Sequence, residues 1–345
     1  MPSPPLILLP RPGTVRPATP QSIPAPPEAA FTSTFGPLRL PPASYLQTPA
    51  GQAAYYTLPA PTGSPSHSPD SPAGPARILF IHGVQTSAVG LLPLARAVAA
   101  RFPSAHCVLL DLWGHGLSAT PLQPHEPALF HRLLLALLDH LRWPAAHLVG
   151  YSFGGSTAAS FAARFPERVE GLVLVAPAGL LRRSQFSARE QGYLVGAGAG
   201  GAADGVDGVD GEAVEREARD WVIEWLEGGA LVVPPDWRER VARGELVAEA
   251  VREWQMREHA GHAASVVGIF RDGGIMDMHE AFRTAAETGI RARVVLGEWD
   301  DLCSVEELVG LGFGDVHVVP GVGHGVVRER VAEVAGLIGE FWGGR

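Results

Sequence analysis

Residues 146–155 read AHLVGYSFGG, and this stretch decides the fold. The apolar run AHLV is typical of a buried strand, and a helix is predicted over 157–164, so the GYSFG between them forms a tight strand-to-helix turn. Such a turn crowds its neighbours, which explains glycine at Gly150 and Gly154. The turn also exposes the Ser152 hydroxyl, as a nucleophile requires.

Ser152 is therefore predicted to be a nucleophile, the alternative being a serine that only caps the following helix. Serine needs a general base to react. His324 lies in the glycine-rich turn PGVGHG after the last predicted strand, and Asp300 and Asp301 follow the strand predicted over 292–296. A carboxylate there would orient the imidazole of His324 and stabilise its charged form. The residues thus predict a triad in the chain order Ser, Asp, His.

Around this stretch, short apolar strands alternate with helical segments between residues 77 and 175. This alternation predicts an α/β protein with a mostly parallel sheet covered by helices on both faces. A hairpin is predicted around PAG at 49–51. After residue 180 the pattern becomes helical, over 212–227, 236–258 and 278–288. Strands return at 292–296 and 315–319, before a closing helix over 328–342.

Four segments follow from this pattern. They are a Pro-rich N-terminal arm (1–42) without helical or strand periodicity, a first part of the core (43–179), a helical cap (180–289) and a second part of the core (290–345). A helical insertion in an α/β pattern is expected to cover the carboxyl edge of the sheet, where ligands bind in open α/β folds.

Five landmarks in this order resemble the α/β-hydrolase superfamily with a serine nucleophile and a cap: HGV at 82–84, DLWGHGLS at 111–118, the Ser152 turn, Gly297-x-x-Asp300, and Gly323-His324. The resemblance implies an α/β-hydrolase fold from about residue 44 to 342. It also implies that the backbone N–H groups of Val84 and Phe153 form an oxyanion hole. His82 and His115 are expected to hold turns rather than to react.

The same resemblance narrows the choice of acid and of chemistry. Some family members carry the acid after the sixth strand, but residues 175–179 read VAPAG and offer no carboxylate. The Gly297-x-x-Asp300 spacing then favours Asp300 over Asp301. Ser152 argues against the family's enzymes with aspartate nucleophiles. His82, Asp111 and His115 do not form a zinc-like ligand set, so neither metal nor cofactor is expected.

Composition restricts the partners. The net charge of −9 argues against nucleic acid or an anionic membrane as a partner, because both require a basic surface.

Cys107 and Cys303 are expected to be free thiols. Leu6 to Leu9 is too short for a signal-peptide core or a membrane span, so a cytoplasmic protein is expected. A homodimer is left open.

The expected substrate is an apolar small molecule. Trp221, Trp225 and Trp254 in the cap, with Tyr151 beside the nucleophile, are the predicted contacts, although aromatic residues at helical spacing more often form a core. The leading hypothesis is hydrolysis of a carboxylic ester, lactone or thioester through an acyl-enzyme. The alternatives are a C–C bond hydrolase or an acyltransferase with the same triad, and a non-catalytic ligand-binding homologue.

Overall fold

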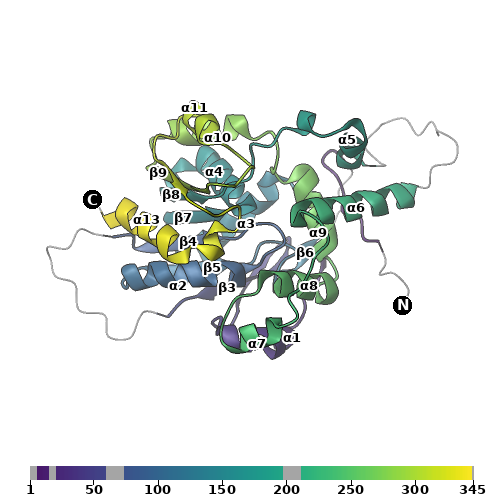
Figure 1. Ribbon diagram of the computed structural model, residues 1–345, viewed down its shortest axis with the longest axis horizontal. Coiled ribbons are helices and arrows are strands. Elements are labelled where there is room, and N and C mark those ends of the chain that lie inside the picture. Colours follow the sequence, from purple (N-terminus) through teal and green to yellow (C-terminus); the bar gives the residue numbers. More distant parts are fainter. Residues whose placement is uncertain (1–5, 15–20, 60–73, 197–210, 344–345) are drawn as a thin grey trace.

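The computed structural model describes residues 6–14, 21–59, 74–196 and 211–343. The strands of its central sheet are β2 (Ser44–Thr48), β3 (Gly51–Thr57), β4 (Arg77–Ile81), β5 (His106–Leu110), β7 (Ala146–Tyr151), β8 (Val169–Val175), β9 (Ala292–Gly297) and β10 (Val316–Val319). Their order across the eight-stranded sheet is β10-β9-β8-β7-β4-β5-β3-β2 (Figure 1). The strands from β10 to β5 run parallel, and the hairpin β2–β3 joins β5 antiparallel.

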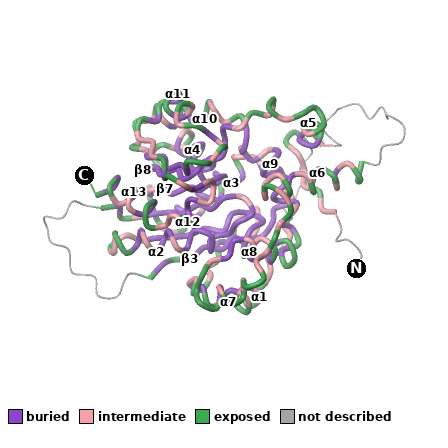
Figure 2. The backbone as a smooth tube through the Cα atoms, in the orientation of Figure 1, coloured by how far each residue is buried: buried purple, intermediate pink, exposed green. Residues whose placement is uncertain are grey.

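Helices cover both faces of the sheet, as the continuous apolar strands require. One face carries α2 (Leu92–Arg101), α12 (Val326–Glu329) and α13 (Val331–Gly343). The other carries α3 (Pro127–His140), α4 (Phe153–Arg164) and α10 (His279–Glu287). The strands between them are buried (Figure 2). The predicted α/β architecture is confirmed.

The helical region differs in detail from the prediction. The helix predicted over 236–258 is two helices, α7 (Trp237–Ala242) and α8 (Ala248–Glu258), because Gly244 takes a φ of +85° between them. Helix α9 (His262–Asp272) was not predicted. The region also contains α5 (Ala188–Val195) and α6 (Gly211–Glu227), whereas α11 (Val305–Gly310) lies outside it, between β9 and β10. Helices α6 and α8 each pack against α9 beyond one end of the sheet (Figure 1).

Helix α10 was predicted to belong to the cap, but it lies on the sheet. It packs against α4 on a face of the sheet, with Phe282 and Ala285 buried in the core. The range predicted for the cap, 180–289, therefore includes a helix that covers the sheet. Periodicity shows that a helix has an apolar face but not which surface that face meets.

The N-terminal segment contains structure that its composition did not predict. Helix α1 (Glu28–Phe35) follows a two-residue strand, β1 (Ser22–Ile23), which pairs with β6 (Thr120–Pro121). Phe31 and Phe35 of α1 pack edge-on against the Trp254 indole, with ring centroids 5.4 and 6.1 Å away. The prediction that Trp254 contacts substrate is wrong, because α1 buries this indole in the core.

A further anchor ties the segment to the helical region. Arg11 donates from Nε and Nη2 to the two carboxylate oxygens of Asp272, at 2.6 and 2.9 Å, and donates to the carbonyls of Leu194 and Val195. Such two-pronged guanidinium–carboxylate contacts fix orientation as well as distance. Within the described ranges, no helix has the length and apolar character needed to cross a membrane.

Replacement of Trp254 by alanine is predicted to lower the free energy of unfolding by about 3 kcal/mol or more, because it opens a cavity between α8 and α1. Relative kcat/KM among acyl groups should stay unchanged, since the indole does not reach the site described below. Denaturant unfolding and an ester panel measure the two effects. A changed acyl preference with unchanged stability would contradict this.

Candidate active site

The turn after β7 holds Ser152 at a φ of +53° and a ψ of −121°, a conformation that side chains rarely adopt. Glycines make it possible. A Cβ at Gly150 would stand 2.3 Å from the Gly154 carbonyl oxygen, and one at Gly154 would stand 2.1 Å from the Ile81 carbonyl oxygen. Any larger residue at either position would force the turn apart.

His324 lies in hydrogen-bond contact with Ser152. Its Nε2 is 2.9 Å from Ser152 Oγ, and its Nδ1 is 3.0 Å from Asp300 Oδ2. The Asp300 side chain is fully buried, and its second oxygen accepts the Leu302 N–H at 3.2 Å. The carboxylate therefore fixes Nδ1 as the protonated nitrogen and leaves Nε2 to accept a proton from Ser152. The structure brings together all three residues predicted as the triad.

The neighbouring carboxylates point elsewhere. Asp301 is exposed, and Glu298 accepts the Gly321 N–H at 2.8 Å. Gly297 explains why the acid can reach His324, because a Cβ there would stand 2.3 Å from the Gly323 carbonyl oxygen. Glycine in Gly297-x-x-Asp300 thus lets the loop that carries the acid lie against the loop that carries the histidine.

Tyr151 holds the backbone of His324 through a hydrogen bond. Its hydroxyl donates to the His324 carbonyl at 3.1 Å and accepts from Arg328 Nη1 at 3.3 Å, and the Arg328 guanidinium lies over its ring. Burial lowers the pKa of His324, but the hydrogen bond and the charge of Asp300 outweigh burial. The pKa of His324 is raised above its usual value as a result.

The predicted oxyanion donors flank Ser152. Phe153 is the first residue of α4, a position whose N–H has no acceptor within its own helix. Val84 and Ser152 line the same cavity, and Gly83 approaches so closely that a Cβ would stand 2.8 Å from Ser152 Cβ. The turn that carries Val84 is therefore adjacent to the nucleophile.

His82 and His115 are fully buried and bond to backbone groups. His82 Nδ1 donates to the Gly83 carbonyl at 2.7 Å, and its Nε2 accepts the Leu112 N–H at 2.9 Å. Burial lowers the pKa of His82 to about 4, so its ring is neutral. Both rings hold turns, in line with the role expected from the sequence.

A cavity of about 980 Å³ opens over Ser152 and His324, here named the Ser152 cavity. Trp221 and Trp225 of α6 line it together with Tyr151, and Trp254 does not. Charged residues also line it and were not predicted: Glu224, Glu227, Glu249, Arg252, Asp301, Arg328 and Glu329. Arg328 had one signal in the sequence, its position four residues after His324. Asp301 lies in the loop after β9, and the others lie on helices. The periodicity of these helices does not show which side faces the cavity.

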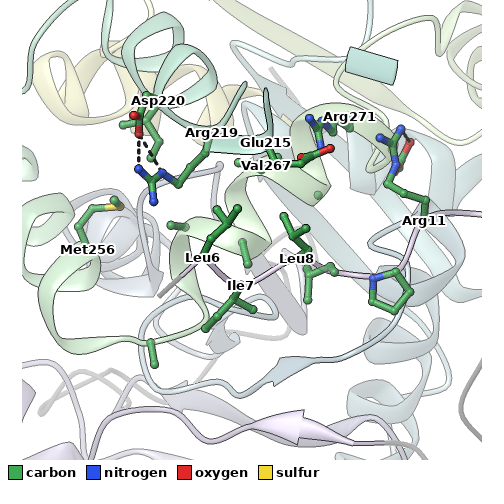
Figure 3. A pocket seen from close by; sticks show the side chains of 18 of the residues that line it. Leu6, Ile7, Leu8, Arg11, Glu215, Arg219, Asp220, Met256, Val267 and Arg271 are labelled. Carbon is green, nitrogen blue, oxygen red and sulfur yellow. Dashed lines mark hydrogen bonds and ion pairs between the residues drawn. The ribbon is translucent and has the colours of Figure 1, made fainter. Parts of the chain in front are cut away.

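A second cavity, of about 870 Å³, lies between residues 6–14 and helices α6, α8 and α9 (Figure 3). Its lining includes Leu6, Met256 and Val267 and shares no residue with the Ser152 cavity. It is therefore separate from the triad.

Comparison with known sequences agrees with this geometry. The sequence profile of the α/β-hydrolase fold matches residues 76–203, which include the Ser152 turn. The chain thus has the α/β-hydrolase fold, and its residues 76–203 are similar to that family in sequence.

Two curated relatives match this chain over short stretches. A dihydrolipoyllysine-residue acetyltransferase component of an acetoin cleaving system from Pseudomonas putida is 47% identical over 73 residues, 21% of this chain and 20% of the relative. The 3-oxoadipate enol-lactonase 2 of Acinetobacter baylyi is 36% identical over 85 residues, 24% of this chain and 32% of the relative. The matches thus span a third or less of either relative.

Solved structures match over most of the chain. An enol-lactonase from Burkholderia xenovorans superposes with a TM-score of 0.56 and 17% identity, covering 87% of this chain and 99% of the other. A carboxylesterase from Bacillus subtilis gives 0.57 and 17%, covering 91% and 96%. At this identity the likeness establishes the fold.

Exchange of Asp300 for asparagine is predicted to lower kcat by up to ~10⁴, because the amide favours the wrong imidazole tautomer. Asp301→Asn is the matched control and should cost little, since Asp301 is exposed. Steady-state kinetics at neutral pH, with circular dichroism as the folding control, separates the two variants. A large loss confined to Asp301→Asn would reverse the assignment.

The pH dependence of kcat/KM should show a rising limb with an apparent pKa above the ~6.5 of an ordinary histidine. His324 accepts a proton only when neutral, so a raised pKa moves activity to higher pH. Asp300→Asn removes the carboxylate that raises this pKa, so the limb of its residual activity should move to lower pH. A limb at or below pH 6.5 in the wild type would contradict the prediction.

Proposed function

We propose that this α/β-hydrolase cleaves a carboxylic ester, lactone or thioester through an acyl-enzyme on Ser152. The observation that carries the proposal is the alignment of Ser152 Oγ, His324 Nε2, His324 Nδ1 and Asp300 Oδ2 through contacts of 2.9 and 3.0 Å. In this order His324 can take the proton of the serine hydroxyl, while Asp300 orients the imidazole and stabilises its charged form.

In the proposed reaction, Ser152 Oγ attacks the substrate carbonyl while His324 Nε2 takes its proton. The N–H groups of Val84 and Phe153 stabilise the alkoxide that forms. His324 then gives the proton to the leaving alcohol or thiol as the C–O or C–S bond breaks. Water repeats the sequence on the acyl-enzyme, which releases the acid and restores the Ser152 hydroxyl.

The lining of the Ser152 cavity supports a neutral substrate with an apolar or aromatic acyl group. Trp221 and Trp225 supply aromatic surface from α6. Carboxylates outnumber guanidinium groups in the lining by five to two, which disfavours an anionic substrate. Helices α6 to α9 are proposed to act as the cap that encloses this substrate. Esterase and lactonase are also the names carried by similar proteins.

Acyl transfer to an alcohol uses the same acyl-enzyme, and one similar protein is named as an acetyltransferase component. The two outcomes differ only in what attacks the acyl-enzyme. Product analysis with an ester in the presence and absence of added alcohol therefore separates them, because transfer yields a new ester and hydrolysis yields the free acid.

A fluorophosphonate probe is predicted to label the wild-type protein and not Ser152→Ala, because only an activated serine reacts. With p-nitrophenyl esters, lactones and acyl thioesters, Ser152→Ala should lose several orders of magnitude in kcat, in line with the ~10⁶-fold losses known for serine triads. Near-normal turnover by a folded Ser152→Ala variant would refute the assignment. Absence of labelling and turnover in the wild type would favour a non-catalytic binding protein.

A further inference from the structure

The turn formed by residues 83–85, here named the oxyanion turn, carries Val84 between two residues whose backbone groups are bound by side chains. Gln85 takes a φ of +63°, which is uncommon for a residue other than glycine and costs free energy unless its surroundings hold it. Four side-chain contacts hold this turn. His82 and Thr86 donate to the Gly83 carbonyl, and the other two contacts are at Gln85.

Both backbone groups of Gln85 are engaged. Its N–H donates to His115 Nε2 at 3.2 Å, and its carbonyl accepts from the Gln255 side-chain amide at 2.8 Å. His115 Nδ1 bonds the Trp113 carbonyl, so its Nε2 is the acceptor nitrogen, and burial keeps the ring neutral by lowering its pKa.

Gln255 lies in α8 and is fully buried. Its Oε1 accepts the Gly116 N–H at 2.8 Å while its Nε2 donates to the Gln85 carbonyl. These partners determine how the amide is oriented, because a backbone N–H can only donate and a carbonyl can only accept. Gln255 does not line the Ser152 cavity, and its direct contact with the oxyanion turn is the bond to the Gln85 carbonyl.

We propose that Gln255 is a positioning residue that aims the Val84 N–H at the oxyanion. Because Gln255 lies in α8, the position of this helix in the helical region determines the geometry of the oxyanion hole beside the sheet. The inference rests on the proposed function, since it requires a negative charge to develop beside Ser152. Hydrogen-bond donors contribute to catalysis only when they are placed where that charge forms.

Gln255→Met tests the proposal, because it keeps the side-chain length and removes both hydrogen bonds. We expect kcat for a p-nitrophenyl ester to fall between about 10-fold and 100-fold, less than the ~10²–10³ for removal of a donor outright. KM should change by less than about twofold, because the donor acts mainly in the transition state. The affinity for an arylboronic acid, which forms a tetrahedral anion on serine, should fall in parallel with kcat.

His259→Phe is the matched control. His259 follows α8 directly, is buried, and donates to the Ser118 carbonyl at 2.8 Å without touching the oxyanion turn. It should lose stability and keep kcat. Gln255→Glu is the second variant: it can still accept the Gly116 N–H but as a carboxylate cannot donate to Gln85, and it should lose kcat at least as strongly as Gln255→Met.

The proposal is overturned if both folded Gln255 variants keep wild-type kcat and boronic-acid affinity while losing stability as His259→Phe does. Equal falls in kcat for the Gln255 and His259 variants would also overturn it, because the effect would then be general to the contact of α8 with the core. An inactive wild type that the fluorophosphonate does not label would instead refute the proposed function.

Discussion

The conformation of Ser152 is the constraint on which the rest of the site depends. A residue with a φ of +53° at the end of a buried strand persists only if its surroundings hold it there. Here β7 is paired on both sides, and the helix that follows packs on the sheet. The close approaches at Gly150 and Gly154 allow strand and helix to meet at so sharp an angle. The strain at one residue is thus offset by the packing of the whole sheet.

The same principle of close backbone approach places the other parts of the triad. Gly297 lets the loop after β9 contact the loop after β10, and this contact brings Asp300 to His324. Tyr151, next to the nucleophile, bonds the His324 carbonyl and so links the histidine loop to β7. The three side chains come from three parallel strands whose carboxyl ends meet at one edge, where open α/β sheets bind ligands.

The helical region contributes both a cavity wall and a structural contact to the site. Helix α6 presents Trp221 and Trp225 to the Ser152 cavity, whereas α8 turns Trp254 away from it toward α1. On another side of α8, Gln255 bonds the oxyanion turn. One helix therefore contacts both the N-terminal segment and the turn beside Ser152.

The sequence by itself determined the parallel sheet, and it predicted Ser152 as nucleophile, His324 as base and the order of the triad, because these depend on local patterns. Apolar runs, glycines at a tight turn and a histidine after the last strand are visible in the order of residues. The spacing in Gly297-x-x-Asp300 also favoured the acid that faces His324. Tertiary structure alone decided that Trp254 lies in the core, that α10 covers the sheet, and that charged side chains line the Ser152 cavity. The physical reason is that periodicity marks a helix face as apolar but carries no information about the distant surface that buries it.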